Sequence, residues 1–296
     1  MNALEDINLI KLNLHDITLL MRTFNEFGLY QSGNTLANEF AERLIEYSKT
    51  NWSLIKLYFN DEVSLTQLCH EFIKTCQNHK ELIAPQDILA CWDYHNVITN
   101  QSILNAIEPL CLEKKDVNIF SYGIGNGEYE LSLKSFLEEK YSINVGVYGY
   151  DPYPDIKSNS ICYVTPEESE QTSYDIIIAR WVLHHVEDNC RWSEFSSFLR
   201  CLSQHGKAII IEHGYTETPP ETLHEKFLAF LNATYDVITN YHLRPSGFIN
   251  HNQTNHSFYI SYLNMDDIAR IGSGYNVTVT TLGPKFPQQT EVVITR

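Results

Sequence analysis

A glycine-rich segment, Ser121-Tyr-Gly-Ile-Gly-Asn-Gly-Glu128, constrains the fold of this chain more than any other feature. It follows a strand-like apolar run at 117–122 and precedes a helix predicted at about 128–140. Its glycines let the backbone turn sharply and let a ligand approach without an intervening Cβ, and the helix that follows presents unpaired N–H groups. The spacing Gly-x-Gly-x-Gly, rather than Gly-x-Gly-x-x-Gly, favours a nucleotide-type ligand without a pyrophosphate group.

Downstream of residue 115 the sequence alternates between short strand-like runs and helical stretches, which is typical of a sheet with crossover helices. The alternating run at 275–282 and the last apolar run at 291–295 have no helix between them, which predicts an antiparallel hairpin. The other predicted strands are 117–122, 145–150, 161–164, 174–179 and 207–212, with a further helix at about 191–202.

Upstream of residue 115 the periodicity is helical, with apolar side chains spaced to share one helix face at 65–76 and again at 103–111. The change in periodicity predicts a helical domain over 1–114 and a sheet domain over 115–296, the latter with an insertion at about 213–262. We expect the helical domain to act as a lid, to mediate dimerisation or to bind a protein partner.

Composition limits the partners of the chain. Lysine and arginine total 21 against 37 acidic residues, for a net charge of −16, and a surface of that sign disfavours nucleic acid. The seven cysteines never occur as Cys-x-x-Cys, and the histidines of the insertion match no standard ligand spacing, so we expect reduced thiols and no metal site. Without a leader-like N-terminus or an apolar run near the ~18 residues of a membrane span, we expect a cytoplasmic protein that does not enter membranes.

The second predicted strand ends at Gly149-Tyr-Asp-Pro152. A carboxylate at the tip of the strand next to the glycine-rich loop can accept hydrogen bonds from both hydroxyls of a ribose. Asp151 is therefore the candidate ribose ligand, and the alternative is an aspartate that only ends a strand.

In this order and at this spacing, residues 115–296 resemble the class I S-adenosylmethionine-dependent methyltransferase superfamily. The resemblance implies an α/β fold, a seven-stranded Rossmann-like sheet with a terminal antiparallel hairpin, and S-adenosylmethionine as cofactor. A stretch at 183–186, Leu-His-His-Val, is similar to one in small-molecule methyltransferases of the ubiquinone-biosynthesis type. The first motif of the family, a glycine-rich loop that binds the cofactor, matches Ser121, Gly123, Gly125 and Gly127. The acid of the family that binds the ribose matches Asp151.

Two positions depart from the family pattern. Ser121 stands where the first motif has an acid, and Thr165 stands where an acid commonly follows the third strand and holds the adenine. Glu167 lies close by and is our candidate for that contact. The serine keeps open a methyltransferase-like module without activity.

Methyl transfer requires a positioned nucleophile and, where that nucleophile must lose a proton, a base. His184 and His185 follow the fourth strand, where the family builds its substrate pocket, and a histidine can take a proton at neutral pH. The alternative is that one histidine satisfies backbone groups while the other is solvated. Arg180 and Trp181, at the tip of that strand, are alternatives that could hold an anion or stack on a flat substrate, and Arg180 is counted among the cofactor contacts.

The leading hypothesis is a methyltransferase that acts on a small-molecule or protein-borne oxygen, nitrogen or carbon nucleophile. The first alternative is a catalytically inactive methyltransferase-like module that binds a partner protein. The second is a component of a viral-type RNA cap methyltransferase, which would need a basic groove. A dinucleotide-dependent oxidoreductase comes last, because the glycine spacing and the terminal hairpin both disfavour it.

Overall fold

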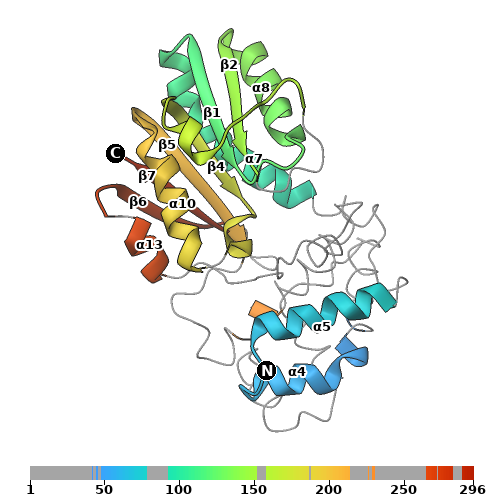
Figure 1. Ribbon diagram of the computed structural model, residues 1–296. Helices are drawn as coiled ribbons and strands as arrows, with labels where there is room; N and C mark the ends of the chain where they lie inside the picture. Colours follow the sequence, from blue (N-terminus) through green and yellow to red (C-terminus); the bar gives the residue numbers. More distant parts are fainter. Residues whose placement is uncertain are drawn as a thin grey trace. The chain divides into compact units, whose positions relative to one another are not determined.

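The chain divides into two compact units, which are described separately (Figure 1). The first comprises 1–96, 216–262 and 283–288, and the second comprises 97–215, 263–282 and 289–296. The computed structural model describes residues 48–78, 93–151, 158–186, 188–213, 265–271, 273–282 and 289–296, with the single positions 42, 45, 226, 229 and 230. The histidines of the predicted insertion lie outside these residues.

The first unit contains helices α4 (Trp52–Phe59) and α5 (Leu65–Asn78), and α5 confirms the helix predicted at 65–76. Phe59 is buried, and its ring lies 5.9 Å from that of Phe230. The Tyr58 hydroxyl donates a hydrogen bond of 3.1 Å to the carbonyl of Lys226. Segments about 170 residues apart in sequence therefore pack together within this unit.

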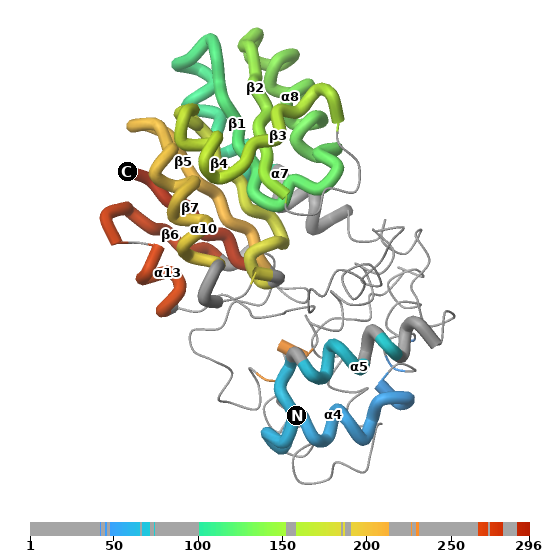
Figure 2. Tube along the Cα trace, in the orientation of Figure 1, coloured from blue at the N-terminus to red at the C-terminus, as the bar shows by residue number. Residues whose placement is uncertain are grey.

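The second unit is built on one seven-stranded sheet in the order β3-β2-β1-β4-β5-β7-β6. Strands β1 to β5 pair in parallel, whereas β7, red in Figure 2, lies between β5 and β6 and is antiparallel to both. This arrangement confirms the predicted fold class and the terminal hairpin. The strands are β1 (Asp116–Tyr122), β2 (Asn144–Tyr150), β3 (Cys162–Tyr163), β4 (Tyr174–Arg180), β5 (Leu202–His213), β6 (Asn276–Leu282) and β7 (Gln289–Thr295).

Helices cover both faces of the sheet and bury two apolar clusters. One cluster joins α7 (Asp93–Glu113) and α8 (Glu128–Tyr141) to the sheet, and the other joins α10 (Asp188–Arg200) and α13 (Met265–Ile271) to the opposite face. The central strand β4 is buried along almost its whole length, as expected for a parallel strand covered on both faces. The short elements α9 (Pro166–Ser169) and η3 (Leu183–His185) complete the unit.

The structure differs from the sequence expectation at two boundaries. Strand β5 begins at Leu202 rather than 207, because Leu202 already pairs with Tyr174 ahead of a register shift in β4. The second unit begins at Val97 rather than 115, since Ile103 and Ile107 of α7 share a buried cluster with β1. No helix among the described residues is long and apolar enough to cross a membrane.

Candidate functional site

The glycine-rich loop connects the carboxyl end of β1 to α8, and its three glycines have different surroundings. All three adopt positive φ angles, of +72° at Gly123, +55° at Gly125 and +72° at Gly127. A Cβ at Gly123 would come within 2.2 Å of Val182, and one at Gly127 would come within 2.0 Å of Ile161. At Gly125 it would meet no atom within 4 Å, so a ligand can approach the backbone at this glycine.

Asp151 lies directly after β2 and beside this loop. Its carboxylate accepts a hydrogen bond of 2.9 Å from the backbone N–H of Gly125. The loop is also tied to β2 by the N–H of Gly123, which donates to the carbonyl of Tyr150 at 2.7 Å. The predicted ribose acid and the open glycine are therefore neighbours at the carboxyl edge of the sheet, where open α/β folds bind ligands.

Ser121 has a carboxylate beside it that was not among the predicted site residues. Its hydroxyl donates a hydrogen bond of 2.8 Å to Glu130, in the first turn of α8, and both side chains are buried. Burial raises the pKa of Glu130, while Ser121 and the nearby Arg180 oppose this effect. An acid in the first turn of the helix after the loop was the signal that could have identified Glu130.

Arg180 ends β4 next to the same place. Its guanidinium carbon lies 3.6 Å from the ring centre of Tyr129 and 4.8 Å from that of Trp181, so two aromatic rings contact it. Burial lowers the pKa of Arg180, but an arginine keeps its charge at neutral pH. Burial also raises the pKa of Tyr129 to about 12, so that its hydroxyl stays protonated.

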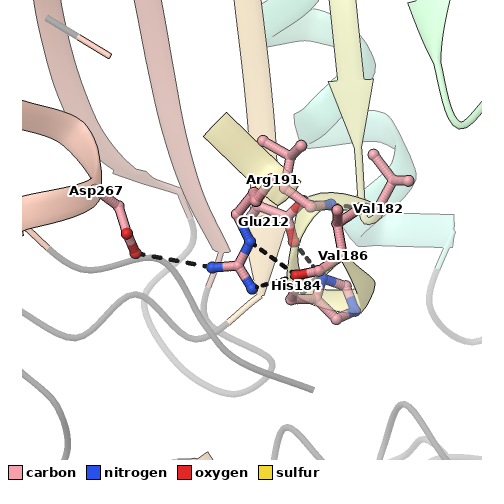
Figure 3. A network of polar contacts seen from close by, with 7 residues as sticks. Val182, His184, Val186, Arg191, Glu212 and Asp267 are labelled. Carbon is pink, nitrogen blue, oxygen red and sulfur yellow. Dashed lines mark hydrogen bonds and ion pairs between the residues drawn. The ribbon is translucent and has the colours of Figure 1, made fainter. Parts of the chain in front are cut away.

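A buried polar network holds the segment that follows β4 (Figure 3). Glu212 of β5 accepts hydrogen bonds from the backbone N–H groups of Val182 and Leu183, at 3.0 and 2.7 Å. Its other carboxylate oxygen contacts Nδ1 of His184, which is fully buried. Burial and Arg191 lower the pKa of His184 to about 3, so its imidazole is neutral and donates from Nδ1 to the carboxylate.

Arg191 extends this network toward α13. Its Nε and Nη2 donate to the carbonyl of Val186 at 3.2 and 2.9 Å, and Nη1 lies 3.8 Å from Asp267 (Figure 3). Asp267 also accepts a hydrogen bond of 2.9 Å from the indole of Trp192. The network therefore links β5, α10 and α13 to the backbone that carries His184.

The remaining predicted site residues are not brought into these contacts. Glu167 is exposed in the first turn of α9, and the neighbouring Glu168 forms a capping box with Thr165. His185 belongs to η3, but its side chain lies outside what the structure describes. Among the described residues, no group of three or more histidine, cysteine or acidic side chains could hold a metal ion.

No protein-family model and no curated protein matches the sequence. Among solved structures, the chain is similar to the CMeT domain of the citrinin polyketide synthase, with 14% identity, 94% of this chain and 68% of that one covered, and a TM-score of 0.43. The CurJ carbon methyltransferase is 15% identical, with 97% of this chain and 83% of that one covered and a TM-score of 0.41. The Haemonchus contortus phosphoethanolamine N-methyltransferase 2 in complex with S-adenosyl-L-methionine is 14% identical, with 62% of this chain and 49% of that one covered and a TM-score of 0.39.

The strand order and pairing define the class of fold without these comparisons. Five parallel strands with a sixth and seventh added as an antiparallel hairpin form the sheet of the class I methyltransferase superfamily. The glycine-rich loop and the acid after β2 lie at the carboxyl edge of that sheet. The second unit therefore has the class I methyltransferase fold.

Proposed function

We propose that this chain is an S-adenosylmethionine-dependent methyltransferase, with Gly123, Gly125, Gly127 and Asp151 in its cofactor site. The observation that carries the proposal is the 2.9 Å hydrogen bond between Gly125 and Asp151. It holds a partly exposed carboxylate beside the one loop glycine that has open space at its Cβ position. A ribose can then meet the carboxylate while the rest of the nucleoside lies along the loop.

Bound S-adenosylmethionine supplies a methyl group that its positive sulfur already activates. The chain has to bind and orient this cation, and Glu130, held by Ser121, offers a buried carboxylate near the loop. We propose that Glu130 replaces the acid that the first motif of the family has at the position of Ser121. Glu167 is kept as the candidate for the adenine, and Arg180 as an anion-binding residue at the same edge of the sheet.

The acceptor is proposed to be an oxygen, nitrogen or carbon nucleophile on a small molecule or a protein. Of the two histidines after β4, His184 is fully buried and donates from Nδ1 to Glu212, which makes it a positioning residue for the η3 turn. His185 follows it in the same turn and is the candidate general base.

Residues 1–114 are proposed to cover the site, to form a homodimer or to bind a protein partner. Cys69, Cys111, Cys162 and Cys201 are free thiols, which supports the proposed cytoplasmic location. The net charge of −16 argues against a nucleic-acid substrate.

Calorimetric titration with S-adenosylmethionine and S-adenosylhomocysteine tests the proposal. We expect micromolar binding that weakens at least about tenfold in Asp151→Ala, because the ribose loses its acceptor. The control is Asp116→Ala, which removes an exposed carboxylate at the opposite end of β1. If the folded protein binds neither ligand, the result would contradict the proposed methyltransferase activity and favour an inactive module that binds a partner protein.

A further inference from the structure

Arg180 is held at the carboxyl end of β4 by aromatic rings rather than by acids. The ring of Tyr129 lies 3.6 Å from its guanidinium carbon, and the ring of Trp181 lies 4.8 Å away. Stacking of this kind occupies the flat faces of a guanidinium and leaves its in-plane N–H donors for hydrogen bonds. These two aromatic contacts therefore position the arginine without using its N–H donors.

Those donors have no acceptor in the described part of the chain. Glu130 is close enough to influence the charge of Arg180, but the two form no ion pair, and the Glu130 carboxylate is bonded to Ser121. Arg180 remains partly exposed, so its N–H groups can reach a bound molecule. An arginine that is stacked, charged and without an acceptor among the described residues is suited to bind an oxyanion in a bidentate manner.

Two further features occur in the same contact. The Tyr129 hydroxyl is buried and has no hydrogen-bond partner among the described residues, and a buried polar atom in that state calls for an explanation such as a ligand. Trp181 has a φ of +53°, a left-handed conformation that is costly for a bulky residue and that concentrates at functional sites. Both side chains belong to the pair of rings that holds Arg180.

We propose that Arg180, stacked against Tyr129 and Trp181, binds an oxyanion of the methyl acceptor, so that the substrates of this chain carry a carboxylate or a phosphate. The inference rests on the proposed function, because it places the acceptor at the edge of the sheet beside the cofactor. It also revises the sequence expectation that Arg180 contacts the cofactor. The fork of the guanidinium selects a planar carboxylate or a phosphate over a neutral amide, which cannot accept two charge-assisted hydrogen bonds.

Calorimetric titration with benzoate, phenyl phosphate and benzamide, with and without S-adenosylhomocysteine, tests this proposal. We expect at least one of the two anions to bind about tenfold more tightly than benzamide. Arg180→Gln should abolish this preference, while Arg180→Lys, which keeps the charge but loses the planar fork, should retain part of it. Arg200→Gln is the matched control, because Arg200 is exposed on α10.

Each outcome assigns Arg180 a different role. Equal binding of the three probes, or no binding of any, would overturn the proposal. A different outcome is that S-adenosylhomocysteine displaces the anion and itself binds more weakly to Arg180→Gln. In that case Arg180 binds the carboxylate of the cofactor, and the assignment to the methyl acceptor is wrong. Because the probes are also titrated without S-adenosylhomocysteine, anion binding at Arg180 can be measured even if the chain does not bind the cofactor. Thermal unfolding of each variant shows that it is folded.

Discussion

Ser121 in β1 donates a hydrogen bond of 2.8 Å to Glu130 in α8, and both side chains are buried. The resemblance to the superfamily leads us to expect an acid at the position of Ser121, and we propose that Glu130 supplies this carboxylate from the helix instead of the strand. A carboxylate is thus still present near the end of β1, although the residue that provides it lies nine positions further along the chain.

Replacement of Glu130 by glutamine separates a role in stability from a role in binding. Because burial raises the pKa of Glu130, the stability it contributes is greatest below its ordinary pKa and is lost as the pH rises through the raised value. At pH 7 we expect Glu130→Gln to unfold at the same temperature as the wild type or higher, yet to bind S-adenosylhomocysteine more weakly. Glu128→Gln, an exposed change in the same turn, is the control, and unchanged affinity in Glu130→Gln would remove Glu130 from the cofactor site.

The open glycine of the loop has a matched partner elsewhere in the same unit. Gly125 and Gly274 both have positive φ angles, and at either position a Cβ would meet no atom within 4 Å. Alanine therefore costs each about 1 kcal/mol or more through backbone strain alone, and we expect both variants to lose similar stability in urea unfolding. Only Gly125→Ala should also weaken cofactor binding in calorimetry, and equal affinities in the two variants would contradict the assignment of Gly125.

The buried histidine predicts a pH dependence of stability. The pKa of His184 is about 3 in the folded protein, against about 6.5 for an unperturbed histidine. Because this pKa is lowered by folding, the contribution of His184 to the free energy of unfolding is complete above about pH 6.5 and is lost as the pH falls toward 3. Urea unfolding between about pH 7 and pH 4 should show a steeper loss in the wild type than in His184→Asn. The exposed His205→Asn should follow the wild type, and a wild-type slope in His184→Asn would show that another group titrates.

Asp175 in β4 is expected to serve stability rather than binding. Its carboxylate forms an ion pair with Lys114 and accepts hydrogen bonds of 3.0 Å from the Ser203 hydroxyl and the Asn118 backbone. Asp175→Ala should lower the free energy of unfolding by about 3 kcal/mol, because these donors lose their acceptor. The exposed Asp116→Ala should change it by less than about 0.5 kcal/mol. A large fall in cofactor affinity in folded Asp175→Ala would contradict this structural role.

The order of elements in the sheet unit could be predicted from the sequence. Short strand-like runs, helical stripes and the glycine-rich turn are local patterns, and they located the strands to within about five residues, including the terminal hairpin. The side chains at the carboxyl edge could also be anticipated, since Gly125 and Asp151 each lie just beyond a strand and parallel strands end at the same edge.

Only the tertiary structure decided which of these side chains meet and which are sealed from solvent. His184 and Arg180 looked alike in the sequence, as polar residues near the end of β4. In the structure His184 is fully buried against Glu212, whereas Arg180 contacts the rings of Tyr129 and Trp181. Glu130 reaches Ser121 because the glycine turn brings the first turn of α8 back over the end of β1. Burial, partner and pKa depend on contacts between elements distant in the chain, and no local pattern of residues encodes them.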